Sequence, residues 1–298
     1  HIARGWLAEA HQGRDPSKER KDSLTAPTMA DLHTAYIEKH AGKKKSGKAD
    51  ADLFRLHILH AMRTMRVAAV TTHDIDRFMR QRAATPVQAN RCLSLLSKAF
   101  NLSIRWGWRQ DNPAKGAERY PEKGRKRYLN ADEYLRLSEA LTALQAESPG
   151  GVAAIRVMLL TGARLGEIVR SKRAWLRNGR LYLPDSKTGE KEIHVPTAAL
   201  DIINATLPVD GWLCGISSRP TKVWNKARTM AGLPDLHIHD LRHSFASQAL
   251  AAGMTLLQIG ELLGHASPIT TKRYAHLEDE IKAKAAETVA DRIIARMG

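Results

Sequence analysis

The chain has 298 residues and a mass of 33.1 kDa, which is long enough for two domains that each bury a core of their own. Lysine and arginine number 47 against 31 aspartate and glutamate residues, and the resulting net charge of +16 favours a polyanionic partner, with nucleic acid ahead of an anionic membrane surface. No apolar run approaches the roughly 18 residues of a membrane span, and the two separated cysteines, Cys92 and Cys214, exclude a disulfide scaffold and suit a reducing cytoplasm.

The first part of the chain predicts a linker followed by a helical bundle. Residues 1–25 are polar and charged after a short helical pattern, and we expect them to be the tail of an N-terminal module followed by a linker. Apolar residues then recur at helical spacing through residues 26–117, which predicts an all-helical bundle. The expected helices cover 28–40, 51–63, 72–84 and 87–108, with Pro86 fitting the first turn of the last one.

Basic residues exceed acidic ones in this bundle, which indicates either a solvated basic face or a face that binds DNA. Several of these residues belong to the glycine-flanked loop AGKKKSGK, and the others lie on the last expected helix. The candidate DNA-binding residues are Lys43, Lys44, Lys45, Lys48, Arg91, Lys98 and Arg105.

The second part of the chain predicts helices around a small sheet. Residues 118–128 have the proline, glycine and charge content of an interdomain linker, so we place a second domain at 129–280. It opens on a capping box, in which Asn130 and Glu133 have the required spacing, and further helices are expected over 135–144 and 151–160. An Asn-Gly pair and alternating residues predict an antiparallel sheet over about 173–196.

Helices return from Thr197 to the end of the chain. The expected fold class is therefore mainly α with a small antiparallel β-sheet. The amphipathic C-terminal helix, residues 281–298, packs on its own domain or docks on a neighbouring protomer through Val289, Ile293 and Ile294.

The segment TGARLGEIV, residues 161–169, is the first candidate for phosphate chemistry. Gly162 makes a turn that places Arg164 near a helix N-terminus, where free amides and the helix dipole favour an anion. The planar fork of arginine can hold two phosphate oxygens at once. Glu167 lies three residues later on the same face, where it either orients a positive side chain or forms an ordinary surface ion pair.

The segment HDLRHS, residues 239–244, is the second candidate. On a helix His239 and Arg242 project together, which offers a second guanidinium and an imidazole that exchanges protons near neutral pH. A zinc site at His237, His239 and His243 is the alternative. It is disfavoured because the segment has no nearby cysteine, no HExxH motif and no zinc-finger spacing of ligands. We interpret His243 as a buried histidine that supports the site.

The third candidate is ELLGHASPITTKRYAHL, residues 261–277. Gly264 ends a helix there, and His265 follows at the turn before a short helix that carries Tyr274. A lone tyrosine on an amphipathic helix is most often a packing residue. Tyr274, however, occurs in one chain with two arginines, two histidines and Lys187, which are residue types suited to binding phosphate. Lys187 falls in the turn between the second and third expected strands.

Taken in order, the segments TGARLGEI, SKTGEKEIHVP, HDLRHSFAS, LLGH and TKRYAH resemble the signature of the tyrosine recombinase family, the phage-type integrases, over about residues 125–280. The catalytic residues that the resemblance implies are Arg164, Lys187, His239, Arg242, His265 and the nucleophile Tyr274. Glu167 occupies the usual acidic position of the family, and His243 supports the site. GRDPSKER is similar to the trailing edge of the arm-binding module of prophage and genomic-island integrases.

The resemblance implies a helical-bundle core-binding domain before a catalytic domain, and a site-specific recombinase that integrates or excises a mobile element in the bacterial nucleoid. Cleavage and rejoining would pass through a covalent 3′-phosphotyrosine with no cofactor and no metal. The implied partners are double-stranded DNA attachment sites and a homotetramer on DNA, with an excision factor and a host DNA-bending protein as candidates and no membrane.

Two other readings of these motifs remain open at this point. A type IB topoisomerase shares the arginine, histidine and tyrosine chemistry but relaxes supercoils as a monomer. A catalytically silent DNA-binding protein descended from an integrase would act as an architectural or regulatory factor. Its expected mark is a lost nucleophile or arginine, and none is lost in this sequence.

Overall fold

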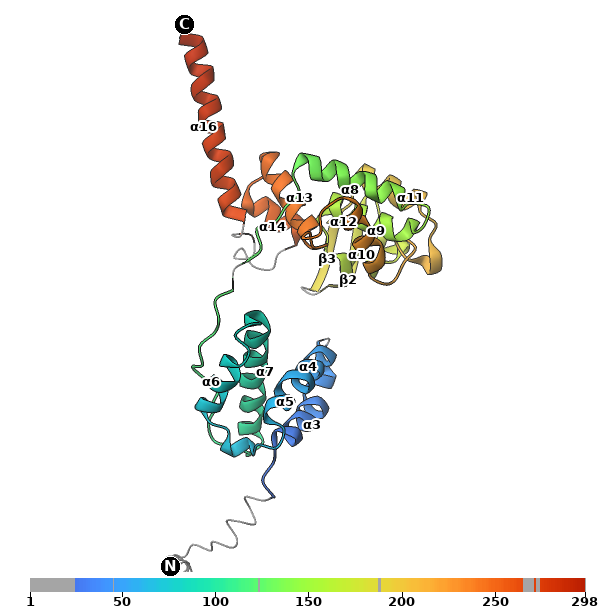
Figure 1. Ribbon diagram of the computed structural model, residues 1–298. Coiled ribbons are helices and arrows are strands. Elements are labelled where there is room, and N and C mark those ends of the chain that lie inside the picture. Colours follow the sequence, from blue (N-terminus) through green and yellow to red (C-terminus); the bar gives the residue numbers. More distant parts are fainter. Residues whose placement is uncertain are drawn as a thin grey trace, which may run out of the picture. The chain divides into compact units, whose positions relative to one another are not determined.

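The computed structural model describes residues 25–44, 46–122, 124–186, 189–264, 271 and 274–297. The chain divides into two compact units between Lys123 and Gly124 (Figure 1). Helices dominate both units, and the three-stranded antiparallel sheet belongs to the second, so the expected fold class is confirmed. Over these described ranges, no helix combines the length and the apolar character that crossing a membrane requires.

The helical unit is built from short amphipathic helices around one core. Capping boxes start two of the helices, Thr28 pairing with Asp31 and Thr71 with Asp74, which satisfies backbone amides that the first turn leaves unbonded. Aromatic side chains fill the core, and Tyr36, Phe54 and Phe100 are fully buried. The elements are α3 (Met29–Lys39), η1 (Ala41–Lys43), α4 (Gly47–Leu53), η2 (Phe54–Ile58), α5 (Leu59–Met62), η3 (Val67–Ala69), α6 (Thr72–Arg80) and α7 (Pro86–Arg105).

The helix expected over 51–63 is not a single regular α-helix. It begins earlier, at Gly47, and changes to π geometry over η2 before α5 completes it. Phe54 and Ile58, at the two ends of this π segment, are both fully buried. A Cβ at Gly47 would lie 2.0 Å from the Ala41 carbonyl oxygen, so the basic loop can turn this tightly only at glycine.

The segment 118–128 is held by each unit in turn. Asn90 on α7 donates to the Tyr120 carbonyl at 2.8 Å and accepts from the Tyr120 amide at 3.0 Å, which fixes the first part to the helical unit. Past Lys123, Arg125 donates to the buried carboxylate of Asp240 at 3.0 Å. The Leu129 amide then donates to Ser244 on the same helix as Asp240 at 2.9 Å.

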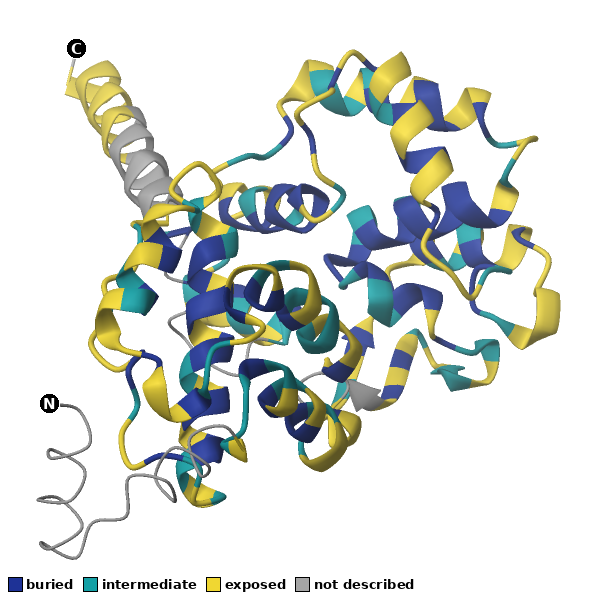
Figure 2. Cartoon of the chain, turned by 60° about the horizontal axis from the view of Figure 1, so that its bottom comes forward, coloured by how far each residue is buried: buried dark blue, intermediate teal, exposed yellow. Residues whose placement is uncertain are grey.

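The second unit surrounds one buried helix, α9, whose Val152, Ile155 and Met158 are fully buried. Figure 2 shows dark blue, buried residues gathered on the packed helices of the chain. The elements are α8 (Ala131–Ala143), α9 (Pro149–Thr161), α10 (Leu165–Val169), η4 (Arg173–Trp175), β1 (Leu176–Arg177), β2 (Arg180–Ser186), β3 (Gly189–His194), α11 (Thr197–Ala205), η5 (Val209–Gly211), α12 (Thr221–Met230), α13 (Asp240–Ala251), α14 (Leu256–Leu263) and α16 (Ala275–Met297).

The sheet forms where the sequence pattern predicts it. Asn178 and Gly179 have φ angles of 50° and 71°, the left-handed pair that a tight two-residue hairpin needs. Strand β2 then pairs antiparallel with β3 in a register that sets Leu183 opposite Lys191. The capping box of α8 is also confirmed, since the Asn130 side chain accepts from the Glu133 amide at 2.9 Å.

Helix α16 presents apolar side chains to solvent at its C-terminal end, which is yellow in Figure 2. Val289, Ile293 and Ile294 are 54%, 52% and 66% exposed, so they do not pack on their own unit in this single chain. Docking of this helix on a neighbouring protomer stays a prediction.

Candidate active site

The turn between α9 and α10 positions Arg164. Helix α9 ends at Gly162, whose φ of 64° and ψ of 7° are left-handed. A Cβ at this position would lie 2.4 Å from Phe245 and 2.7 Å from Leu263, so glycine is required by both the backbone and the packing. The chain turns there and places Arg164 at the N-cap of α10, with its side chain 26% exposed.

Glu167 orients Arg164 from within the same short helix. Its carboxylate accepts from Arg164 Nη1 at 2.7 Å and from the Arg164 amide at 2.9 Å, and the carboxylate is only 8% exposed. Burial alone raises the pKa of Glu167, but the Lys191 charge and the hydrogen bonds from Arg164 hold that pKa below its ordinary value. The contact is therefore a buried orienting pair rather than a surface one.

Lys191 on β3 is the second cation bound to Glu167. Its ammonium donates to Glu167 Oε2 at 3.1 Å and to the Leu263 carbonyl oxygen at 2.9 Å, and the side chain is 7% exposed. Burial lowers the pKa of Lys191, against the opposing attraction of Glu167. Sequence reasoning missed this residue, although strand periodicity places it on the same face as the buried Ile193, where a lysine is unusual.

Arg242 is buried in the first turn of α13, with 2% of its surface exposed. Its guanidinium donates to the Gly162 carbonyl at 2.7 Å and to the Leu263 carbonyl at 2.8 Å, which uses two of its five N–H donors. Burial, reinforced by the nearby charge of Arg164, lowers the pKa of Arg242 to about 10, so the side chain stays cationic at neutral pH. The two predicted arginines therefore lie close enough for their charges to interact, and the carboxylate of Glu167 acts on both.

Tyr274 lies against the same helix. Its ring packs with Ala246, Leu250 and Leu263 and is 4% exposed, and its hydroxyl is 2.7 Å from Nδ1 of His243. The His243 and His239 rings meet edge to face with centroids 5.4 Å apart. His239, at the N-cap of α13, is exposed.

The structure thus brings most of the predicted site residues to one place. Arg164, Glu167, Arg242, His243 and Tyr274 are linked by hydrogen bonds or by direct electrostatic interaction. Lys187 and His265 lie outside the described residues. Across the part of the chain that the structure describes, no group of three or more histidine, cysteine, aspartate or glutamate residues could hold a metal ion.

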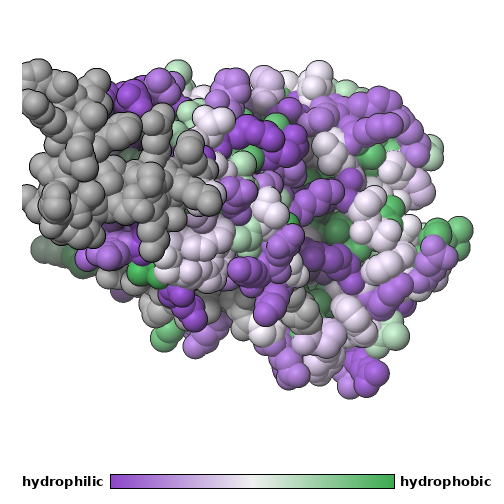
Figure 3. Space-filling view, turned by 90° about the horizontal axis from the view of Figure 1, so that it is seen from below, coloured by the Kyte–Doolittle hydropathy of each residue, from purple (hydrophilic) through white to green (hydrophobic). Residues whose placement is uncertain are grey.

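The candidate DNA-binding residues all belong to the helical unit. Two of them make ion pairs: Lys44 with Asp50 at 2.6 Å, and Arg91 with Glu122 at 3.9 Å. Lys45 lies outside the described residues, and the exposed members of the set are Lys43, Lys44, Lys48, Arg91, Lys98 and Arg105. Figure 3 shows a mainly hydrophilic surface on the face in view, with hydrophobic residues scattered among the polar ones.

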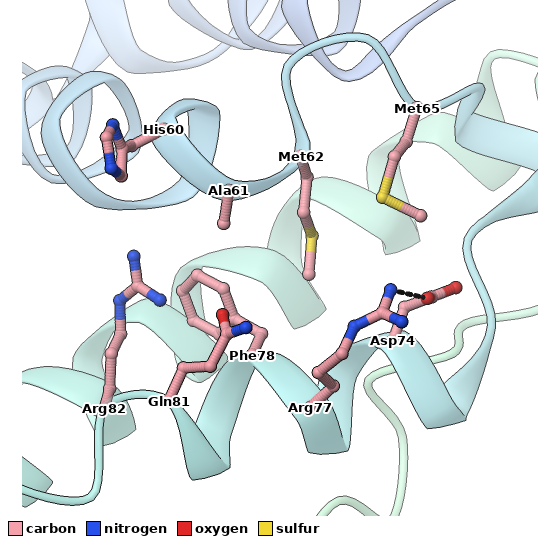
Figure 4. Close-up of a pocket in the computed structure, with 9 residues that line it drawn as sticks. All are labelled: His60, Ala61, Met62, Met65, Asp74, Arg77, Phe78, Gln81 and Arg82. Carbon is pink, nitrogen blue, oxygen red and sulfur yellow. Dashed lines mark hydrogen bonds and ion pairs between the residues drawn. The ribbon is translucent and has the colours of Figure 1, made fainter.

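A hollow of about 280 Å³ in the helical unit lies between the end of α5 and α6 (Figure 4). Its charged side chains are engaged with the protein itself, because Arg77 pairs with Asp74 and Arg82 donates to the His57 carbonyl. Arg82 also stacks on the Phe78 ring at 3.9 Å. These contacts describe a structural cluster rather than a catalytic one.

Replacing Gly162 with alanine is expected to destabilise the second unit by about 2 to 4 kcal/mol, because left-handed strain and overpacking against Phe245 and Leu263 add. Gly253→Ala is the matched control: its φ is 88°, yet a Cβ there meets nothing within 4 Å. Thermal unfolding should show the larger drop in Tm for Gly162→Ala. Equal drops in the two variants would contradict the packing argument.

Comparison with known proteins identifies the family. The model of the Phage integrase family matches residues 216–280, the segment that holds Arg242, His243 and Tyr274. The chain is 30% identical over 268 residues to a putative integrase of Pseudomonas phage Pf1, covering 86% of this chain and 78% of that protein. It is 29% identical over 278 residues to the shufflon-specific DNA recombinase of Escherichia coli, covering 87% and 70% of the two chains.

Solved structures with a similar fold include lambda integrase. A lambda integrase tetramer bound to a Holliday junction superposes with a TM-score of 0.71 at 20% identity, over 89% of this chain and 83% of that chain. This likeness shows a shared fold, and the sequence identity to the Pf1 protein extends it to shared ancestry. The chain therefore belongs to the phage integrase family, the tyrosine-type site-specific DNA recombinases.

Proposed function

We propose that this recombinase cleaves double-stranded DNA at an attachment site by attack of the Tyr274 hydroxyl on one phosphodiester. The bond from Tyr274 oxygen to phosphorus forms as the bond from phosphorus to the 5′ oxygen breaks, which leaves a 3′-phosphotyrosine and a 5′-hydroxyl. The proton of Tyr274 passes to a histidine, His239, and Lys187 gives a proton to the departing 5′ oxygen. His265 donates a hydrogen bond to the phosphate.

One observation carries the proposal: the Tyr274 hydroxyl is hydrogen-bonded to His243, the residue directly after the buried, cationic Arg242. Arg242 and Arg164 would neutralise the charge on the non-bridging oxygens of the attacked phosphate, where charge stabilisation is worth most because water is excluded. One phosphodiester is exchanged for another phosphate ester of similar energy, so the break can be resealed without ATP. This favours recombination over hydrolysis.

The proposal requires Tyr274 to change its partner. In this state the ring is 4% exposed and its hydroxyl is bonded to His243, so the arriving phosphodiester has to replace that hydrogen bond. An unperturbed tyrosine has a pKa near 10, so the attack at neutral pH needs a base. His239, whose ring meets the His243 ring edge to face, would take the proton once the hydroxyl has left His243.

The same proposal extends to the partners. The exposed lysines and arginines of the helical unit would neutralise phosphates of the duplex, and a homotetramer would hold the paired sites, with the apolar end of α16 available to a neighbouring protomer. The lambda integrase structure with a Holliday junction is a tetramer, which supports this assembly. The reaction would integrate or excise a mobile element in the bacterial cytoplasm, with an excision factor and a DNA-bending protein as further candidate partners.

Trapping tests the proposal directly. The chain is incubated with DNA that flanks its own coding gene, and covalently bound fragments are recovered and sequenced. We expect one discrete site, cleavage with the 3′ end attached to protein, and joined products when two sites are supplied. Non-covalent capture should weaken steeply from about 50 to about 200 mM salt, because phosphate neutralisation releases counterions. Relaxed supercoils without joined products, or no adduct at all, would contradict the proposal.

A further inference from the structure

We infer that Lys191 is a positioning residue of this enzyme, a buried ammonium that sets Arg164 and Arg242 in one fixed arrangement. The inference rests on the proposed function, because it assigns both arginines to the attacked phosphate. It adds a second lysine to the site, distinct from Lys187, which comes four residues earlier in the sequence. The Lys191 ammonium contacts Glu167 and the Leu263 carbonyl, to which the two arginines also bind. With its side chain 7% exposed, it would not contact the DNA.

The contacts of Lys191 form a bridge between the two arginines. On one side its ammonium binds Glu167 Oε2 at 3.1 Å, while the other oxygen of that carboxylate binds Arg164 Nη1 at 2.7 Å. On the other side the ammonium binds the Leu263 carbonyl at 2.9 Å, and Arg242 Nη2 binds that same oxygen at 2.8 Å.

Each arginine thus shares one hydrogen-bond acceptor with Lys191: Arg164 shares the Glu167 carboxylate, and Arg242 shares the Leu263 carbonyl. Arg242 is also linked to the Arg164 segment directly, because its guanidinium donates to the Gly162 carbonyl, two residues before Arg164. A displacement of the ammonium would be passed to both guanidiniums, because each shares a hydrogen-bond acceptor with it.

A lysine serves here because its ammonium is a charged donor to the carboxylate of Glu167, which is 8% exposed. The attraction of Glu167 opposes both the burial of the ammonium and its repulsion by Arg242 and Arg164. The two guanidiniums repel one another, and the charge of Arg164 adds to burial, the larger cause, in lowering the pKa of Arg242. Glu167 binds the Lys191 ammonium through Oε2 and directs the Arg164 guanidinium through Oε1, so its carboxylate separates these two positive groups. A neutral residue at position 191 would leave Oε2 without this donor.

Gly264 supplies an independent sign that the lysine chain is built into the site. Its φ is 65°, and a Cβ there would lie 2.4 Å from Cε and 3.0 Å from Nζ of Lys191. The methylene chain of Lys191 therefore runs directly beneath the glycine that ends α14. The ammonium emerges beside the carbonyl of Leu263, so strand β3 and the end of α14 are joined at one point.

The test measures single-turnover adduct formation and duplex affinity with Lys191→Met, Lys191→Arg and the unsubstituted chain, on a nicked duplex that carries the site recovered by trapping. We expect Lys191→Met to bind with unchanged affinity and to form adduct about 10- to 100-fold more slowly at saturating DNA, because misplacement of about 1 Å has effects of this size. Lys191→Arg, which keeps the charge and the donors, should recover part of the rate.

Lys226→Met is the matched control, since the Lys226 ammonium binds Glu147 at 2.7 Å on an exposed surface and its loss should leave the rate unchanged. Should Lys191→Met not fold, Lys191→Gln takes its place with the same expected outcomes. A rate within about threefold of the unsubstituted chain would overturn the inference alone, and so would equal losses in Lys191→Met and Lys191→Arg. Absence of adduct from the unsubstituted chain would overturn the proposed function and this inference with it.

Discussion

A Tyr274→Phe chain is expected to bind duplex DNA with unchanged affinity and to form no covalent adduct with it. The substitution removes the attacking oxygen and keeps the ring that packs against Ala246 and Leu250. It also removes the 2.7 Å hydrogen bond to His243, which should cost about 1 kcal/mol of unfolding free energy. Adduct formation on the nicked duplex, followed as a band that survives denaturation, measures the first effect, and thermal unfolding measures the second.

The chain offers a control that repeats this chemical change elsewhere. Tyr36 in the helical unit is fully buried, and its hydroxyl donates to Asp50 at 2.7 Å. Tyr36→Phe therefore loses a hydrogen bond of the same kind, and its adduct formation should match that of the unsubstituted chain. An adduct from Tyr274→Phe at the ordinary rate would show that a different side chain is the nucleophile.

Local chemistry explains why much of the second unit could be predicted from sequence. The Asn178-Gly179 turn depends on two adjacent residues that tolerate left-handed backbone, and the capping box of Asn130 and Glu133 depends on residues three apart. The spacing of Arg164 and Glu167 also lies within one helical turn, and their predicted contact is present at 2.7 Å. Such features form whenever the segment folds, so the pattern alone is sufficient.

The features that could not be predicted join segments far apart in the chain. Lys191 binds Glu167, 24 residues earlier, and Leu263, 72 residues later, and neither spacing is visible in any local pattern. No local pattern selects the hydrogen-bond partner of the Tyr274 hydroxyl either, because His239 and His243 are both on or beside α13 and only tertiary packing sets His243 against it. The π geometry of η2 could not be predicted either, because the spacing of the buried Phe54 and Ile58 is the one that a regular α-helix would give.

The buried state of Arg242 explains why arginine, rather than lysine, suits this position. Burial lowers the pKa of Arg242 to about 10, which still leaves it charged at neutral pH. A lysine would start about two units lower and be shifted in the same direction by the same burial. It would also offer a compact ammonium in place of a planar fork that reaches the Gly162 and Leu263 carbonyls together.

Arg242→Ala and Arg164→Ala are each expected to slow adduct formation by at least about 100-fold, since one stabilising donor is typically worth about 2.7 to 4 kcal/mol in the transition state. Arg180→Ala is the control, because the Arg180 side chain pairs with Glu192 at 2.8 Å on the exposed part of the sheet and should be dispensable. Near-normal cleavage by either site variant would reject a phosphate held by two guanidiniums.

Arg242→Lys separates charge from shape within the same experiment. Because burial lowers the pKa of a cation, the charged form of the introduced lysine should be lost as pH rises through that lowered pKa. The ratio of its adduct rate to that of the unsubstituted chain should therefore fall between about pH 6 and about pH 9, whereas the Arg242→Ala ratio should stay low and flat. A flat Arg242→Lys ratio would mean that the fork, through its bonds to Gly162 and Leu263, contributes more than its charge does.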